Sequence, residues 1–380
     1  MSRLLKQAAL PIAIALTVAA PATFRAAAGG HATDGATAVP ATSRVAGGHA
    51  NEGATATPWN TEGVPATSAA TTVETITVHG PSLEGNLAGD SADRRVIVYL
   101  PPSYGERRDQ RYPVVYLLHG YGGGADVWER HRVPEDMNKA FASGAREMIV
   151  VAPDARTIYD GSMYSNSVTI GDWESFVADD LVRYVDSHYR TIASRDGRGI
   201  AGFSMGGYGT LRIAMKRPDV FSAAYAMSSC CLTPTVGLRP STDLEKVTTK
   251  EEAKAVERRL RTSLALAAAW APNPNRPPLY FDTPTRNGEP QPDVIAALNA
   301  NAGLTLVHQY VPALKRLKAL GLEIGLQDGL LASNERMHAL LEAYKVEHTW
   351  ETYEGDHGNR LPERIETRMV PFFSKHLASR

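Results

Sequence analysis

The chain has 380 residues, of which 43% are hydrophobic, so it is long enough to bury one large core or two smaller ones. Forty basic residues stand against forty-one acidic ones, and the formal net charge is -1. This balance creates no positive field that would attract nucleic acid or an anionic membrane surface, so we expect neither as a partner.

The N-terminus, up to about residue 28, is typical of an export signal. Arg3 and Lys6 carry positive charge, an apolar stretch covers residues 8–20, and Ala20-Pro21-Ala22 offers small residues for cleavage. The apolar stretch is short for a membrane-spanning helix, although an uncleaved N-terminal anchor is the alternative. The sequence therefore predicts a secreted or periplasmic protein with no stable membrane insertion after signal cleavage.

A spacer is predicted over residues 29–70, where Ala, Thr, Gly and Pro dominate and large apolar residues are scarce. Such a composition cannot bury enough surface to fold, so we expect disorder. Residues 29–43 are loosely repeated at 47–68, which suggests a duplicated flexible linker. We expect His31 and His49 within it to be solvated, not bound to a metal.

Strand and helix signals alternate from residue 71 to the end. Strand-like runs are found at 72–78, 96–100, 114–118, 148–152, 199–203, 223–227, 322–325 and 348–353, and amphipathic patterns predict helices at 173–189, 207–216, 334–344 and 363–376. This alternation predicts an α/β domain over 71–380, with a mostly parallel, doubly wound sheet and helices on both faces. The first two strands lack a long crossover and are expected to form an antiparallel edge.

An insertion breaks this rhythm after the sixth strand. Residues 232–300 contain a charged helical stretch followed by a proline-rich one. In an open α/β sheet the carboxyl ends of the strands form the ligand-binding edge, so the insertion begins where a cap would contact substrate. A peripheral decoration is equally compatible with the sequence, because long loops also tolerate drift.

The stretch "GFSMGG" at residues 202–207 presents a candidate nucleophile, Ser204. A serine hydroxyl is a weak nucleophile and must be displayed where a base can remove its proton. A sharp turn between strand and helix achieves this, and Gly202 and Gly206 leave room for such a turn. Since an apolar strand precedes Ser204 and a helical pattern follows it, we interpret Ser204 as a nucleophile.

Five segments of the chain resemble a known family. They are "RRVIVYLPPSY" (94–104), "YPVVYLLHGYGG" (112–123), "GDWESFVADDLVRYVDSHYRT" (171–191), "RGIAGFSMGGYGTLRIAMKRPDVF" (198–221) and "YEGDHGNR" (353–360). Together they resemble the secreted esterases of the α/β-hydrolase superfamily, which include feruloyl and acetylxylan esterases, S-formylglutathione hydrolase, enterochelin esterases and mycolyltransferases. The resemblance implies the α/β-hydrolase fold and a Ser-His-Asp triad.

The base and the acid of such a triad follow late strands. His357 follows the strand at 348–353 and matches the family's position, whereas His338 and His348 fall within predicted elements and are expected to be structural or solvent-facing. Asp328 lies between nucleophile and base and gives the order Ser, Asp, His. Asp356 is the alternative acid, but its adjacency to His357 places it poorly for bonding Nδ1.

Backbone donors are also needed, to stabilise the oxyanion that develops on the attacked carbonyl. By motif these are the N–H groups of Tyr121 and Met205. Tentative substrate contacts are Gly122, where the backbone can approach closely, and Tyr164 and Asn166, which follow a strand end.

These features predict an exported serine esterase that hydrolyses small-molecule or polysaccharide-linked carboxylic esters through an acyl-enzyme. We expect no metal and no organic cofactor, because the sequence contains no HExxH, no paired CxxC and no dinucleotide fingerprint. An acyltransferase on the same scaffold is the nearest alternative. A non-catalytic binding protein is a more distant one, since all triad and oxyanion elements are present.

Overall fold

The computed structural model describes residues 70–234 and 242–379, which belong to one compact unit, Pro65–Arg380. The predicted signal peptide, and the predicted spacer apart from residue 70, lie outside the described residues. Over the described part of the chain, no helix combines the length and the apolar character needed to cross a membrane.

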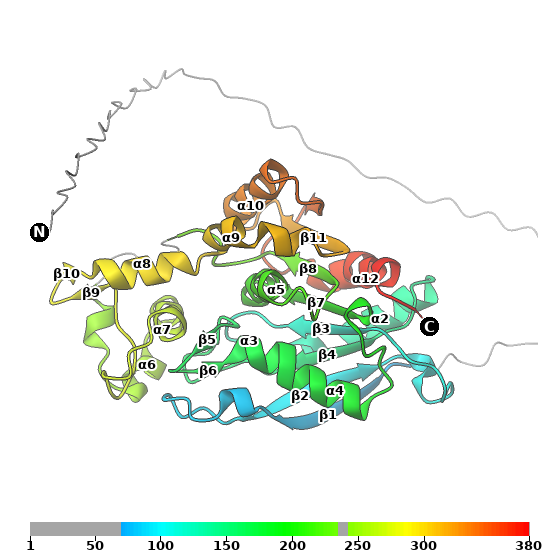
Figure 1. The fold of residues 1–380 in the computed structure, drawn as a ribbon, viewed down its shortest axis with the longest axis horizontal. Coiled ribbons are helices and arrows are strands. Elements are labelled where there is room, and N and C mark those ends of the chain that lie inside the picture. Colours follow the sequence, from blue (N-terminus) through cyan, green and yellow to red (C-terminus); the bar gives the residue numbers. More distant parts are fainter. Residues whose placement is uncertain (1–69, 235–241, 380) are drawn as a thin grey trace, which may run out of the picture. The chain divides into compact units, whose positions relative to one another are not determined.

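A central sheet of eight strands organises this unit (Figure 1). The strands lie in the order β1-β2-β4-β3-β7-β8-β11-β12, with the bounds β1 Thr72–His79, β2 Asp93–Leu100, β3 Val114–Leu118, β4 Ile149–Pro153, β7 Arg198–Phe203, β8 Ala223–Met227, β11 Ala319–Gly325 and β12 Thr349–Tyr353. The β1–β2 and β2–β4 pairs are antiparallel and all other pairs are parallel. The predicted mostly parallel sheet with an antiparallel first pair is therefore confirmed.

Side chains alternate between the two faces of the sheet along each strand, and in the inner strands both faces are buried. In β2, Val96 and Val98 join one hydrophobic cluster, and Ile97 and Tyr99 join the other. All four side chains are fully buried. Near-continuous apolar strands of this kind are expected when helices cover both faces of a parallel sheet.

The two clusters are completed by two sets of helices. One face carries α1 (Val127–Arg130), α2 (Val133–Ala142), α11 (Leu361–Arg364) and α12 (Val370–His376), with a π-helical segment at Ile365–Met369. The other carries α3 (Trp173–Ser175), α4 (Leu181–His188), α5 (Met205–Lys216), α9 (Gly303–Leu314) and α10 (Leu331–Ala343), with a π-helical segment at Phe176–Asp180. This arrangement is the α/β-hydrolase fold.

The insertion follows β8, the sixth strand of the sheet, as the sequence predicts. It contains α6 (Lys250–Ala255), α7 (Arg258–Trp270), a short hairpin of β9 (Thr285–Arg286) and β10 (Glu289–Pro290), and α8 (Pro292–Ala300). Its longest helix, α7, packs on the loop after β4: the Trp270 indole N–H donates to Ser165 Oγ (3.0 Å), and Ser167 Oγ donates to Ala268 O (2.6 Å). The insertion therefore lies over the carboxyl edge of the strands.

The remaining elements are short. They are the two-residue strands β5 (Asn166–Ser167) and β6 (Gly171–Asp172), and 3₁₀ turns at Pro81–Leu83, Pro102–Tyr104, Arg195–Gly197 and Leu244–Lys246.

Candidate active site

Ser204 lies on the turn between β7 and α5 in a strained backbone conformation, with φ 57° and ψ -111°. Such a conformation costs a non-glycine residue about 1–3 kcal/mol. The flanking glycines explain how the turn closes. A Cβ on Gly202 would lie 2.3 Å from the carbonyl oxygen of Gly206, and a Cβ on Gly206 would lie 1.9 Å from that of Leu118. Only glycine fits at either position, so the packing around the turn holds Ser204 at the edge of the sheet.

A continuous hydrogen-bonded chain joins Ser204, His357 and Asp328. His357 Nε2 lies 3.0 Å from Ser204 Oγ, and His357 Nδ1 lies 2.8 Å from Asp328 Oδ2. A carboxylate can only accept, so Nδ1 carries the proton and Nε2 accepts from the serine hydroxyl. This is the tautomer that a general base next to a serine requires.

Asp328 is 5% exposed and is nevertheless suited to remain ionised. Burial alone would raise the pKa of its carboxyl group. Hydrogen bonds from His357 and from the Leu330 N–H (2.9 Å) outweigh burial, so the pKa of Asp328 lies below its ordinary value. A carboxylate that stays charged can orient the imidazole and stabilise its protonated form.

The loops that carry Asp328 and His357 are fastened to each other at the ends of β11 and β12. Gln327 N–H donates to Gly355 O (2.9 Å), and Gly355 N–H donates to Gln327 Oε1 (2.7 Å). A Cβ on Gly325 would lie 2.2 Å from Gly355 O, so the two backbones approach as closely as glycine permits. Residues 29 positions apart in the chain are thus held at a fixed distance.

Asp356, the alternative acid, bonds within its own loop. Its Oδ1 accepts the N–H groups of Gly358 (3.0 Å) and Asn359 (2.9 Å), and these bonds lower its pKa. The His357 ring contacts Phe203, with ring centroids 4.8 Å apart, and this contact limits how the imidazole can rotate.

Met205 and Tyr121, whose N–H groups are the predicted oxyanion donors, converge beside Ser204. Because α5 begins at Met205, its N–H has no acceptor within the helix. A Cβ on Gly161 would lie 2.7 Å from both Met205 Sδ and the Tyr121 ring, so the two residues meet around this glycine. A Cβ on Gly120 would lie 3.3 Å from Ser204 Cβ, so the residue before Tyr121 lies against Ser204.

His119 shapes the loop that bears Tyr121 and is fully buried. Its Nε2 accepts the Ala155 N–H (2.9 Å), so its Nδ1 carries the proton and donates to Gly120 O (2.8 Å). Burial lowers the pKa of His119 and keeps it neutral. The imidazole therefore acts as a fixed brace between the loops after β3 and β4.

A cavity of about 220 Å³ opens next to this loop. Its lining is mainly apolar and backbone: Gly120, Tyr121, Gly122, Gly123, Val127, Trp128, Arg130, His131, Phe203 and Leu361. Since Gly120 and Phe203 border both the cavity and the Ser204–His357 pair, a group bound there would lie beside Ser204.

The insertion reaches the same loop through α7. Arg261 donates to Asp160 Oδ2 (2.6 Å), and the backbone oxygen of Asp160 accepts the Gly122 N–H (3.0 Å). Arg258 donates to Tyr121 O (3.3 Å). The sequence left open whether the insertion is a cap or a peripheral decoration, and these contacts favour a cap, because they place α7 against the loop that bears Tyr121 and Gly122.

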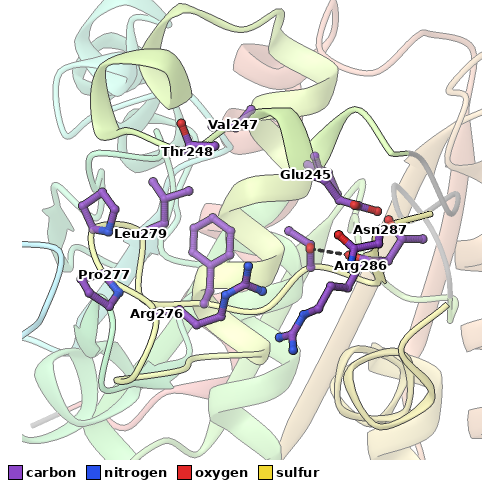
Figure 2. Close-up of a pocket in the computed structure, with 13 residues that line it drawn as sticks. Glu245, Val247, Thr248, Arg276, Pro277, Leu279, Arg286 and Asn287 are labelled. Carbon is purple, nitrogen blue, oxygen red and sulfur yellow. Dashed lines mark hydrogen bonds between the residues drawn. The ribbon is translucent and has the colours of Figure 1, made fainter. Parts of the chain in front are cut away.

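A second cavity, of about 250 Å³, lies wholly within the insertion. In Figure 2, Pro277 and Leu279 lie at one end of it, and Glu245 and Arg286 lie at the other. Its lining includes none of Ser204, His357 or Asp328.

The predicted substrate contact of Tyr164 is wrong. Tyr164 is fully buried, its ring fills the space left by Gly209 of α5, and its hydroxyl donates to His119 O (3.1 Å). Asn166 supports the start of α3, where its Oδ1 accepts the Glu174 N–H (2.8 Å). Gly122 adopts a positive φ of 73° and lines the cavity beside Tyr121.

Several residues of the site were not singled out from the sequence. Phe203 carries a usable signal, because it immediately precedes the nucleophile at a strand end. No signal in the sequence pairs Asp160 with Arg261, since 101 positions separate them and the charges of a helix do not indicate which distant residue they contact. Within the described residues, the group with metal-ligand spacing is His338, Glu342 and His348, which includes no triad member.

Comparisons with known proteins agree with this fold. The model of the Esterase family matches residues 91–361. Esterase Rv1288 of Mycobacterium tuberculosis is 36% identical over 137 residues, which cover 35% of this chain and 28% of that relative. The endo-1,4-beta-xylanase/feruloyl esterase of Xylanibacter ruminicola is 32% identical over 129 residues, 33% of this chain and 18% of that relative. The matched stretch thus spans less than a third of either relative.

Solved structures extend the match over most of the chain. A ferulic acid esterase superposes with a TM-score of 0.60 at 24% identity, covering 81% of this chain and 99% of that one. The fluorophosphonate-binding serine hydrolase F of Staphylococcus aureus, solved with substrate bound, gives a TM-score of 0.56 at 18% identity and covers 80% and 99%. At these identities the likeness establishes the fold.

Proposed function

The chain belongs to the Esterase family, whose model spans residues 91–361, and on this premise we propose that it is an exported serine esterase acting through Ser204, His357 and Asp328. The observation that carries the proposal is the hydrogen-bonded chain from Asp328 through His357 to Ser204. Strain at Ser204 supports it, because a serine with positive φ at a helix start is held in place only by surrounding structure.

In the proposed reaction Ser204 Oγ attacks the ester carbonyl carbon while His357 Nε2 takes the hydroxyl proton. The C–O bond to the alcohol then breaks, and His357 returns the proton to the leaving oxygen. Water, deprotonated by the same imidazole, next attacks the acyl carbon; the bond to Ser204 Oγ breaks, His357 returns the proton to that oxygen, and the acid is released. Asp328 keeps its negative charge throughout and stabilises the imidazolium formed in each step.

Charge on the carbonyl oxygen is met by the N–H groups of Met205 and Tyr121. Both belong to backbone that packing already fixes, so little reorganisation is needed when the charge develops. The positive end of α5 points at the same position, since this helix begins at Met205.

The proposed substrate is a carboxylic ester whose acyl or alcohol part fits the mainly apolar cavity beside Tyr121 and Phe203. Two of the similar proteins are described as a feruloyl esterase and a ferulic acid esterase, which adds aromatic acyl esters to the substrates to be tested. Export is proposed from the basic, apolar and small-residue pattern of the first 28 residues.

The test is hydrolysis of p-nitrophenyl acetate and methyl ferulate by the purified chain and by Ser204→Ala. Loss of the nucleophile should lower kcat by about 10⁴- to 10⁶-fold, because the members of a triad act as a unit. An unchanged circular dichroism spectrum and Tm would show that the variant is folded.

A fluorophosphonate probe supplies an independent readout. It should label the native chain, and neither the heat-denatured chain nor Ser204→Ala should be labelled. Substantial activity in the folded variant, or labelling that persists without Ser204, would refute the proposed mechanism.

A further inference from the structure

A cluster of metal-ligating side chains lies apart from the triad, between α10 and the start of β12. His338 and Glu342 stand one turn apart on α10, a spacing that places both side chains on one face of the helix. His348 immediately precedes β12. One ligand atom from each of the three residues lies within 4.8 Å of the other two.

His348 is oriented as a ligand would be. Its side chain is 0% exposed, and its Nδ1 donates to Val346 O (2.7 Å). This bond places the proton on Nδ1 and leaves Nε2 unprotonated, with a lone pair that can coordinate a metal, the arrangement usual for a metal-bound imidazole. Nε2 faces Nδ1 of His338 at 2.8 Å and Oε1 of Glu342 at 3.9 Å.

Of the other two residues, His338 has a fixed ring plane and Glu342 has an exposed side chain. The His338 ring stacks on Trp350, with centroids 5.0 Å apart and an interplanar angle of 5°, so its ring plane is set by β12. Glu342 is 65% exposed at its side chain and pairs with no Lys or Arg in the described ranges 70–234 and 242–379. Its carboxylate can therefore swing toward the two imidazoles without breaking another ion pair.

A hydrogen bond from His338 Nδ1–H to His348 Nε2 would account for that one contact. It would not account for the approach of a carboxylate to the same point. Two imidazoles and one carboxylate converging from a helix and a strand end form a donor set typical of Zn²⁺ and similar ions.

We propose that His338, Glu342 and His348 bind a divalent first-row transition ion of the zinc class, with water as a fourth ligand. Ca²⁺ and Mg²⁺ prefer oxygen ligands and would bind poorly here. Metal–nitrogen bonds of about 2.0–2.1 Å in a tetrahedral site require the two nitrogens to separate to about 3.3 Å. A small rotation of His338 supplies this, while its proton moves from Nδ1 to Nε2 so that both imidazoles bind neutral.

The expected role of the ion is structural. It would tie α10, which follows the Asp328 loop, to the amino end of β12, whereas His357 follows the carboxyl end of the same strand. The site is therefore separate from ester hydrolysis, and neither proposal depends on the other.

The test uses the full chain, first treated with EDTA and then titrated with Co²⁺ and Zn²⁺. Four-coordinate Co²⁺ should give intense visible absorption that one equivalent of Zn²⁺ removes, and Zn²⁺ should raise Tm by about 2 °C or more where Mg²⁺ does not. His338→Ala and His348→Ala should each lose the absorption and the Tm shift. Should either variant misfold, the exposed Glu342→Gln should still lower Zn²⁺ affinity by about tenfold or more.

His308→Ala is the control, because His308 is an exposed histidine outside the cluster, hydrogen-bonded to Tyr344 just after the end of α10. This variant should behave as the unaltered chain does. His31 and His49 are present in every variant, so binding there would survive in His338→Ala. Absence of the Co²⁺ absorption in the unaltered chain, or its persistence in His338→Ala, would overturn the proposal. Esterase activity should be equal with and without EDTA, because the site lies apart from Ser204.

Discussion

Asp328 combines burial with ionisation because each of its oxygens is hydrogen-bonded. Oδ2 meets His357 and Oδ1 meets the Leu330 N–H, so the charged form is solvated by the protein in place of water. Asp356, the neighbour of His357 in the chain, is instead exposed, and its Oδ1 accepts N–H groups of its own loop. The carboxylate that is 29 positions from His357 in the chain therefore contacts its imidazole, whereas the adjacent carboxylate bonds elsewhere.

Asp328→Asn should lower kcat by about 10⁴-fold. The amide would present an N–H group to His357 Nδ1 and favour the tautomer that cannot accept the Ser204 proton. Initial rates on p-nitrophenyl acetate measure the effect, and Asp356→Asn serves as control because its remaining oxygen can still accept the Gly358 N–H. Equal losses in the two variants would contradict the assignment of Asp328 as the acid.

Asp90 illustrates the opposite balance. Burial raises its pKa from 3.8 to about 6, and the attraction of Arg94 and Lys250 only partly offsets this. The folded state therefore holds the proton more tightly than the unfolded state. The stability of the protein should fall as pH rises from about 4 to about 6, and the full penalty should be present above that window.

Asp90→Asn should consequently stabilise the protein at about pH 8 by about 1–3 kcal/mol. Near pH 4, where Asp90 is protonated in the folded state, the two proteins should have similar free energies of unfolding. Urea denaturation at both pH values measures the difference. A gain that is the same at both pH values would mean that charge burial is not its cause.

At the scale of elements, α7 connects the insertion to the loops around the nucleophile. Arg261 pairs with Asp160, whose backbone oxygen holds the Gly122 N–H next to the predicted oxyanion donor Tyr121. The helix is held by the burial of its apolar half, which includes Leu264, and by the Trp270 indole hydrogen bond. Its charged N-terminal half, which includes Arg258 and Arg261, therefore contacts the loops around Tyr121 and Asp160.

Arg261→Ala should reduce kcat about tenfold with a smaller change in KM. A loosened loop would lose more stabilisation of the transition state than of the bound substrate. The change should leave the fold intact, since Arg261 is partly exposed. Arg259→Ala on the same helix is the control and should retain full activity. A parallel loss in both variants would point to a general disturbance of α7.

At the scale of the whole molecule, a buried ion pair joins the sheet to the C-terminal helices. Arg364 of α11 donates to Glu323 of β11 (2.7 Å), with side chains 4% and 0% exposed, and Tyr225 of β8 donates to the same oxygen (2.6 Å). Arg364 also reaches Glu351 of β12 (2.9 Å). Burial raises the pKa of Glu323 in spite of these partners. Three strands and the helix after His357 thus share one charge network.

Arg364→Ala should destabilise the protein by about 3–5 kcal/mol, because it leaves Glu323 buried without its counter-ion. Arg368→Ala removes an exposed partner of Glu351 and should cost about 1 kcal/mol or less. Thermal and urea unfolding compare the two variants. Similar losses would show that the buried pair contributes no more than a surface pair.

Much of the fold could be predicted because its signals are local. Buried parallel strands require apolar runs, as in β3, β4 and β8, and every strand of the central sheet coincides with a predicted strand within a few residues. The turn at Ser204 was also visible in the sequence, since its packing accepts only glycine at positions 202 and 206. The order of Ser204, Asp328 and His357 also follows from which loops come after which strands.

Contacts between distant segments were decided only by the tertiary structure. Tyr164 has a loop position typical of a substrate contact, yet packing against α5 buries it. The ion pair between Arg261 and Asp160 and the meeting of His338 with His348 depend on how helices cross strands. Local patterning determined the sheet, the helices and the nucleophile turn, whereas side-chain partners across the fold depend on three-dimensional packing that no local pattern encodes.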